Sequence, residues 1–305
     1  MRKIAIYDSF TEPKHRRLID ETAARAGFTV DYYAALAAVP ADKRGDYEVI
    51  YGMPKPGELK DFVNLKWFCG SFAGVDAYLD DSLYPSPEVM LSNSSGAYGV
   101  TIAEHMVMVT LMLLRHAPAY YADQAAGRWG RVLPMRSIMG STITIVGTGD
   151  IGTEFARRAK AMGAAAVRGV RRTKKAADPA FDEIHTNDEL DALLPDTDIL
   201  ALALPATGET KGFLSAARLA LLPKTAYVVN VGRGSAIDQA ALLDALNHDR
   251  LAGAALDVFE QEPATNHALY SHPMVSCTPH IGAATQEAQK RIGTEIVSII
   301  ENFGK

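Results

Sequence analysis

The chain has 305 residues, which is long for a single domain and favours two domains with ample chain for a packed core. Its 31 lysines and arginines against 36 aspartates and glutamates leave a formal net charge of −5, so charge gives no reason to expect nucleic acid or an anionic membrane as a partner. We expect small molecules and a second copy of the chain instead.

Two features indicate the cytoplasm. The apolar run in the N-terminal MRKIAIYDSF is interrupted by Tyr7 and Asp8 and is too short for the core of a signal peptide. Cys69 and Cys277 suit a reducing compartment and lack the spacing of metal ligands, so we expect two small buried side chains and no metal site.

Short β-rich runs alternate with helical patterns in the first part of the chain. The runs are KIAIYD, FTVDYY, YEVIYG and LKWFCG, and an amphipathic helix is expected over residues 13–26. This alternation predicts a parallel sheet with crossover helices.

The stretch from Gly99 to Tyr121 is apolar enough to raise the question of a membrane span. Four polar residues interrupt it before it reaches the run of about 20 apolar residues that a span requires; they are Glu104, His105, Arg115 and His116. We therefore expect one long helix that is buried between domains or subunits.

A second series of strands and helices begins at TITIVGTGDIG. It continues through a helix to Met162, AAVRGV, a helical region over 187–194, DILALALP, another helix, AYVVNVGRG, a helix over 238–247, LAGAALDVF and MVSCTPHIG. This order predicts a complete doubly wound unit. A last helix over 285–303 has no strand of its own and is expected to pack on the first domain.

Gly147, Gly149 and Gly152 form G-x-G-x-x-G directly after an apolar strand and at the start of a helix. The first glycine permits a tight turn, the second lets a pyrophosphate approach the backbone, and the third lets helix and strand pack closely. The N-terminus of the helix adds free N–H donors and positive potential. In this context the motif predicts dinucleotide binding rather than an ordinary turn.

The next strand ends where such folds usually carry an acidic residue that binds the ribose 2′-hydroxyl. Here the run VRRTKK follows instead, without a carboxylate before Asp178. Arg171 and Arg172 can form charge-assisted bonds with a 2′-phosphate, which predicts a preference for NADP(H) over NAD(H). For Lys174 and Lys175 we prefer the interpretation of a solvated basic loop.

Reactive side chains follow the last three strands of the series. Arg233 lies in a glycine-flanked loop, Asp257 and Glu262 follow the next strand, and His280 follows the last. Ligands of open α/β sheets bind beyond the carboxyl ends of the strands, so we expect these groups to converge beside the nicotinamide. Histidine suits proton exchange near neutral pH, and arginine suits a carboxylate.

These motifs together resemble the D-isomer-specific 2-hydroxyacid dehydrogenase family, which contains glyoxylate/hydroxypyruvate reductases, D-lactate dehydrogenases and phosphoglycerate dehydrogenases. The resemblance covers nearly the whole chain. The matching segments are FCGSFAGVD, GVTIAEHMV, TIVGTGDIG, LPATGETKGF, VVNVGRGSAIDQAAL, GAALDVFEQEP and TPHIGAAT.

The resemblance implies a role for each catalytic candidate. Arg233 would bind the substrate carboxylate and polarise the keto oxygen, His280 would be the general acid for reduction, and Glu262 would orient His280 and favour its protonated form. The substrate would also contact the loop formed by Ser71, Phe72, Ala73, Gly74 and Val75.

The resemblance also implies a wider set of cofactor contacts, in which Asp257 would meet the nicotinamide carboxamide and Thr101 would lie near the cofactor. The remaining positions are Gly147, Gly149, Asp150, Ile151, Gly152, Arg171, Arg172, Pro205, Thr210, Val231, His280 and Gly282.

The family fold would combine a flavodoxin-like substrate-binding domain, residues 1–98 plus 286–305, with a Rossmann cofactor domain, a doubly wound parallel sheet over residues 99–285. The family also implies a homodimer, with the long helix near residues 101–117 as hinge and dimer element.

The expected function is NAD(P)H-dependent reduction of a small 2-keto acid to the D-2-hydroxy acid, of the glyoxylate or hydroxypyruvate type. One alternative is a non-catalytic, corepressor-like NAD(H) sensor. Another is an NAD-linked D-phosphoglycerate or D-lactate dehydrogenase; for phosphoglycerate, the arginines and the lack of an extension after residue 305 argue against it. Side chains such as Tyr51, Met53, Phe72 and Tyr98 are candidates for substrate selection or for the core.

Overall fold

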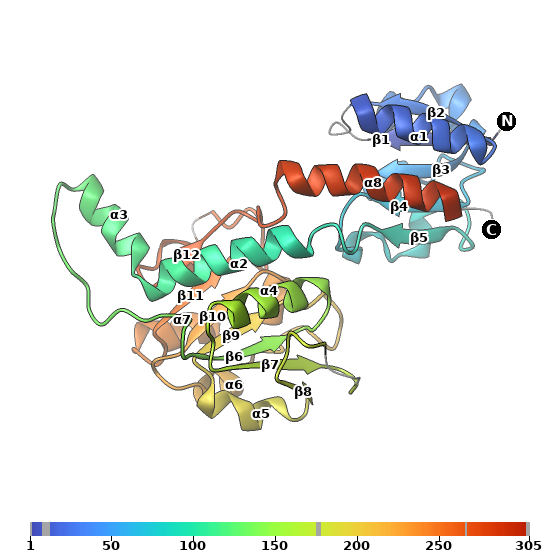
Figure 1. Ribbon diagram of the computed structural model, residues 1–305. Helices are drawn as coiled ribbons and strands as arrows, with labels where there is room; N and C mark the ends of the chain where they lie inside the picture. The colour runs from blue at the N-terminus through green and yellow to red at the C-terminus, as the bar shows by residue number, and fades with distance from the viewer. Residues whose placement is uncertain (1, 8–12, 175–177, 266, 303–305) are drawn as a thin grey trace. The chain divides into compact units, whose positions relative to one another are not determined.

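The computed structural model describes residues 2–7, 13–174, 178–265 and 267–302. The chain divides into two compact units. Unit 1 consists of Met1–Tyr98 and Thr285–Lys305, and unit 2 of Gly99–Ala284 (Figure 1). Each unit contains a parallel sheet with helices, so the predicted α/β class is confirmed.

Unit 1 is built on a five-stranded sheet in the order β2-β1-β3-β4-β5, in which every pair is parallel. This is the flavodoxin-like order that the sequence predicts. The strands are β1 (Arg2–Tyr7), β2 (Phe28–Tyr33), β3 (Tyr47–Gly52), β4 (Trp67–Gly70) and β5 (Met90–Asn93). The sequence did not predict β5, because MLSN is short and half polar and shows no alternation.

Two helices of unit 1 pack against each other, α1 (Pro13–Arg25) and α8 (Gln286–Asn302). Arg25 and Glu301 lie 3.9 Å apart, and the Arg291 Nε donates a 2.7 Å hydrogen bond to the carbonyl of Ala97. The last segment of the chain therefore belongs to the same unit as the first.

The core of unit 1 combines aliphatic with aromatic side chains. Its buried cluster includes Tyr47, Phe62, Phe68, Tyr78 and Tyr84, with rings at tilted angles rather than face to face. Tilted arrangements suit the charge distribution of aromatic rings.

Unit 2 is built on a seven-stranded parallel sheet in the order β12-β11-β10-β9-β6-β7-β8. The strands are β6 (Thr142–Val146), β7 (Ala166–Arg171), β8 (Glu183–Thr186), β9 (Ile199–Leu202), β10 (Tyr227–Asn230), β11 (Gly253–Leu256) and β12 (Val275–Cys277). The chain enters at the centre with β6, builds outward through β8, and returns to build β9 to β12 on the other side. This is the doubly wound Rossmann order, with its switch point between β6 and β9.

The helices of unit 2 are α2 (Gly99–Leu114), α3 (Ala117–Ala125), α4 (Asp150–Ala161), α5 (Leu190–Leu193), α6 (Ala216–Leu221) and α7 (Gln239–Asn247). Ser215 and Asp238 cap α6 and α7, because their side chains accept hydrogen bonds from the N–H groups of Arg218 and Ala241. The sequence did not predict β8, a four-residue edge strand.

The described residues also form short 3₁₀ helices. They are η1 (Leu36–Ala38), η2 (Ala41–Asp46), η3 (Pro56–Glu58), η4 (Asp76–Tyr78), η5 (Asp81–Leu83), η6 (Leu194–Asp196), η7 (Gly234–Ala236) and η8 (Ala268–Ser271).

The single long helix expected over 99–121 is wrong. The chain forms α2 and α3, which are bent by 68° with respect to each other. His116 between them has a positive φ of 55°, and Pro118 near the start of α3 has no N–H with which to continue the α2 hydrogen bonds. In the described part of the chain, no one helix has both the length and the apolar composition that crossing a bilayer demands.

Candidate active site

The glycine loop joins β6 to α4. A Cβ at Gly147 would lie 2.5 Å from the Ala203 carbonyl oxygen, and one at Gly152 would lie 1.9 Å from the Gly147 carbonyl oxygen. Close backbone packing therefore requires both glycines. A Cβ at Gly149, the residue that precedes α4, would meet no atom within 4 Å. The protein's own packing leaves this position open, as the approach of a pyrophosphate requires.

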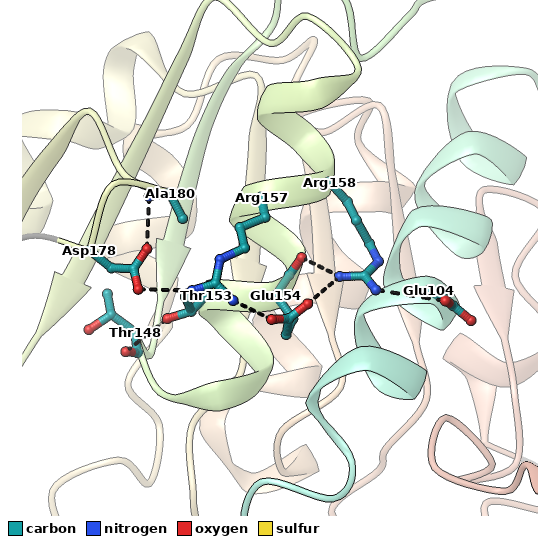
Figure 2. A network of polar contacts seen from close by, with 8 residues as sticks. All are labelled: Glu104, Thr148, Thr153, Glu154, Arg157, Arg158, Asp178 and Ala180. Carbon is teal, nitrogen blue, oxygen red and sulfur yellow. Dashed lines mark hydrogen bonds and ion pairs between the residues drawn. The ribbon is translucent and has the colours of Figure 1, made fainter. Parts of the chain in front are cut away.

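A network of charged side chains holds helix α4, which follows this loop (Figure 2). Arg157 joins Glu154 to Asp178, 3.0 Å away, and Arg158 joins Glu154 to Glu104 on α2, at 2.6 and 3.7 Å. Arg158 and Arg157 hold the pKa of the Glu154 carboxyl below its usual value, against the opposing effect of burial. The network connects α4 to α2 and to the segment after β7.

The basic run begins inside β7, whose last residue is Arg171. The Arg171 Nε is buried and has no hydrogen-bond partner within the described residues. Arg172 is exposed and lies 3.6 Å from Glu209, and Lys174 lies 4.0 Å from Glu189. Arg172 and Lys174 are thus partly compensated by acidic neighbours. Lys175 lies outside the described residues.

Arg233 follows β10 in a loop that Asn230 holds in place. The buried Asn230 side chain accepts a hydrogen bond from the Gly232 N–H and donates one to the Arg233 carbonyl, at 3.1 and 3.0 Å. A Cβ at Gly232 would lie 2.5 Å from the Leu204 carbonyl oxygen, and one at Gly234 would lie 1.9 Å from the backbone of Phe259. Both flanking glycines are needed because neighbouring loops touch the backbone beside Arg233.

His280 and Glu262 form a direct pair at the ends of neighbouring strands. The His280 Nδ1 lies 2.7 Å from one Glu262 carboxylate oxygen, and the other accepts a 2.9 Å hydrogen bond from the Phe259 N–H. Because Glu262 is held by its own loop, it can orient the imidazole, and the described residues provide no hydrogen-bond partner for the His280 Nε2. The side chains are 51% and 36% exposed, so the pair contributes little to stability.

His280 also has a positive φ of 55°. For a residue other than glycine this conformation costs roughly 1–2 kcal/mol and requires support from the surrounding structure. The His280 N–H donates a 2.9 Å hydrogen bond to the Asp257 carbonyl.

The Asp257 carboxylate is 4% exposed and binds the same loop. One oxygen accepts hydrogen bonds from the Thr278 hydroxyl and the Ile281 N–H, at 2.6 and 2.9 Å, and the other accepts one from the Gly282 N–H at 3.0 Å. Asp257 is therefore a loop-capping acid, and its predicted contact with the nicotinamide stays a prediction.

A cavity of about 440 Å³ opens beside the His280 and Glu262 pair. It is mainly apolar, and Phe259, Pro263, Tyr270 and Asp257 are among the residues that line it. The Phe259 and Tyr270 rings meet edge to face, 5.8 Å between centroids, which gives the wall a fixed form.

The other predicted cofactor residues of unit 2 differ in exposure. Thr101, Val231 and Gly282 are buried, Ile151 is half-buried, and Asp150 and Pro205 are exposed. The Thr210 hydroxyl donates a 2.6 Å hydrogen bond to the Pro205 carbonyl and accepts one from the Thr207 N–H, so it stabilises its own loop.

The predicted substrate loop, Ser71 to Val75, follows β4 in unit 1 and is half-buried. Within the described residues, the N–H groups of Phe72, Ala73 and Gly74 donate no hydrogen bond. The Phe72 ring stacks on Tyr78, and the Tyr98 hydroxyl donates to the Ser71 carbonyl. The loop thus has a braced backbone with donors available for an anion.

The other candidates for substrate selection separate clearly. Tyr51 is 2% exposed and its hydroxyl contacts Ser94, so it belongs to the core of unit 1, whereas Met53 is 57% exposed.

Sequence reasoning missed Asn230 and Thr278. Asn230 is a polar residue at the end of the apolar run YVVN, which was a usable signal for a loop-holding side chain. Thr278 gave no such signal, because its partners are distant in sequence.

Burial raises the pKa of Cys69 to about 11 and that of Cys277 to about 12, so both thiols stay protonated near neutral pH. Among the residues described, no cluster of three or more histidine, cysteine or acidic side chains could hold a metal ion.

Comparison with known proteins identifies the family. Residues 107–282 match the model of the D-isomer specific 2-hydroxyacid dehydrogenase NAD-binding domain. The D-3-phosphoglycerate dehydrogenase of Bacillus subtilis is 36% identical over 71% of this chain and 41% of its own length, so the match spans less than half of that relative. The hydroxypyruvate reductase of Thermotoga maritima is 32% identical over 78% of this chain and 77% of its own length.

A solved structure resembles the whole chain. The D-isomer specific 2-hydroxyacid dehydrogenase of Xanthobacter autotrophicus, crystallised with NADPH and MES, is 29% identical and superposes with a TM-score of 0.80 over 98% of this chain and 95% of its own. The chain belongs to the D-isomer specific 2-hydroxyacid dehydrogenase family.

Proposed function

We propose that this protein is an NADP(H)-preferring D-2-hydroxyacid dehydrogenase that reduces a small 2-keto acid of the glyoxylate or hydroxypyruvate type. The observation that carries the proposal is the His280–Glu262 pair, 2.7 Å apart, at one end of the sheet whose central strand leads into the glycine loop. An acid and a dinucleotide loop on one sheet edge suit proton-coupled hydride transfer.

Two observations support the fit to NADP(H). The open position at Gly149 allows a pyrophosphate to approach the backbone and the N-terminus of α4. At the end of β7, the Arg171 Nε has no partner in the described chain, so at least part of this guanidinium is not engaged by the protein. We propose that Arg171 and Arg172 bind the 2′-phosphate; the relative crystallised with NADPH is consistent with this.

In the proposed reaction, the keto carbon would receive a hydride from NADPH when this cofactor is bound. Arg233 binds the substrate carboxylate and polarises the keto oxygen. His280 donates the Nε2 proton to that oxygen. Glu262 stabilises the protonated imidazole from which this proton comes. Asp257 holds the loop of His280 and would contact the carboxamide of a bound cofactor. The N–H groups of Ser71 to Val75 provide further donors for the carboxylate.

In this proposal the two units have different binding functions. We propose that residues 1–98 with 286–305 bind the substrate and that residues 99–285 bind the cofactor. We also propose a cytoplasmic homodimer, for which two free thiols, one buried and one half-buried, and the exposed apolar residues around α3 provide support.

Initial rates test the proposal. Glyoxylate, hydroxypyruvate, pyruvate, 2-ketobutyrate and phenylpyruvate are each offered with NADPH and with NADH. We expect the fastest turnover with NADPH as cofactor and with either glyoxylate or hydroxypyruvate as substrate. His280→Ala should lower kcat by about 10²- to 10⁴-fold and leave NADPH binding intact. The exposed His248→Ala serves as the control. Tight cofactor binding without turnover on any acid would favour the sensor alternative instead.

A further inference from the structure

A histidine outside the proposed catalytic set contacts the loop of His280. His105 lies in the second turn of α2, and its side chain is only 9% exposed. Its Nε2 is 3.0 Å from the Thr278 hydroxyl oxygen and 3.6 Å from the Asp257 carboxylate. None of the roles proposed above uses this residue.

The hydrogen bonds fix which atom carries the proton. The Thr278 hydroxyl has one hydrogen, which it donates to the Asp257 carboxylate at 2.6 Å. Its oxygen must then accept from His105, so the His105 imidazole carries its proton on Nε2. Burial lowers the pKa of His105, although the Asp257 carboxylate acts in the opposite direction. The lowered pKa favours the neutral ring near pH 7.

The chain of contacts ends at the catalytic loop. His105 donates to Thr278, Thr278 donates to Asp257, and the Asp257 carboxylate accepts from the N–H groups of Ile281 and Gly282. The packing at the base of this loop is tight, because a Cβ at Gly282 would lie 2.9 Å from Asp257 and 3.4 Å from the His105 ring. A side chain on α2 therefore closes the pocket in which the Asp257 carboxylate is held.

The buried Asp257 carboxylate needs each of its hydrogen-bond donors. A buried anion depends on a full set of donors, and the left-handed backbone of His280 depends on a loop that cannot relax. Loss of the His105 donor would leave Thr278 free to rotate and Asp257 less firmly held. The imidazole of His280 would then sample positions in which Nε2 does not face its target.

We propose that His105 is a positioning residue for the reaction: through Thr278 and Asp257 it fastens the 280–282 loop, and with it the His280 imidazole, to helix α2. This inference rests on the proposed function for its kinetic consequence, whereas its structural part concerns the loop alone.

The test compares three variants of α2 with the wild type. His105→Leu removes the donor, and His105→Gln can restore an N–H near the position of Nε2. Thr110→Val is the matched control, because Thr110 lies on the same helix, is buried, and has a hydroxyl without a hydrogen-bond partner in the described residues. Thr278→Val breaks the same connection from the other side and replaces His105→Leu if that variant does not fold.

Two readouts are measured. Hydrogen exchange of the cofactor-free protein reports on residues 278–284, and steady-state kinetics separate kcat from KM. We expect His105→Leu to speed exchange of the Ile281 and Gly282 amides and to lower kcat by up to about 10²-fold with little change in KM, since a displacement near 1 Å can have that effect. His105→Gln should recover most of both, and Thr110→Val should resemble the wild type.

Unchanged exchange in His105→Leu, or equal effects of His105→Leu and Thr110→Val, would overturn the inference. Failure of the proposed function has a different signature, since the wild type itself would then turn over no 2-keto acid while the exchange comparison still decides whether His105 fastens the loop.

Discussion

At the scale of single residues, the site depends on carboxylates whose oxygens are already engaged by backbone groups. Glu262 accepts from the Phe259 N–H with one oxygen and faces His280 with the other. Asp257 accepts from two N–H groups and a hydroxyl. Each acid is therefore oriented before any ligand binds, and this preorganisation is what a proton donor of fixed direction requires.

Replacing Glu262 tests that orientation. Glu262→Gln keeps the shape of the side chain but removes the charge that favours the protonated imidazole of His280. Reduction uses the proton of this imidazole, and an amide cannot supply the negative charge that stabilises it, so kcat for reduction should fall by about tenfold or more. The measurement is kcat for reduction of the variant and the wild type under one set of conditions.

The neighbouring Glu260→Gln is the control, because Glu260 is an exposed acid of the same loop. Equal kcat values for the two variants and the wild type would mean that Glu262 does not influence the proton donor.

At the scale of elements, strand ends were predictable and short edge elements were not. The sequence predicts Arg171, Arg233 and His280 at the ends of strands because each follows a buried apolar run, and β7, β10 and β12 end within a few residues of them. It does not predict β5 or β8, since four-residue edge strands with polar residues lack periodicity.

Contacts between distant elements were equally hidden. The His105 and Thr278 side chains meet across 173 residues of sequence, and no local pattern indicates their contact. The sequence presents His105 only as a polar interruption of an apolar helix. The break after α2 follows from Pro118, which is visible in the sequence. The apolar character of the stretch nevertheless favoured the prediction of one continuous helix.

The end of β7 carries the prediction about cofactor choice. In the double variant Arg171→Ala, Arg172→Ala, the KM for NADPH should rise roughly tenfold or more, because charge-assisted hydrogen bonds are lost, while the KM for NADH should change little. Initial rates with both cofactors at a fixed 2-keto acid concentration give the ratio. Lys174→Ala is the control, since Lys174 lies near Glu189 and is expected to add only background potential. A ratio that the double variant leaves unaltered would mean that the run is an ordinary basic loop.

At the scale of the whole molecule, the segment around α3 exposes large apolar side chains, which a monomer would leave in unfavourable contact with water. In Figure 1, α3 and the loop after it extend away from the sheet of unit 2. Trp129 is 98% exposed, Leu133 71% and Tyr121 60%. The loop is nevertheless braced, because the Tyr120 hydroxyl contacts the Val132 N–H at 3.1 Å and the Arg136 N–H reaches the Leu114 carbonyl at 3.0 Å.

A braced loop that presents a tryptophan to solvent is typical of an interface rather than of a mobile segment, since aromatic anchors dominate binding energy at protein contacts. We therefore expect a homodimer in solution, with about twice the mass of the chain by light scattering. Trp129→Lys with Leu133→Lys should shift the protein toward the monomer, because the interface would have to bury two charges. Val63→Lys, which changes a 69% exposed apolar residue of unit 1, should leave the mass unchanged. If the double variant keeps the mass of the wild type, the dimer forms elsewhere or the chain is a monomer, and α3 requires another partner.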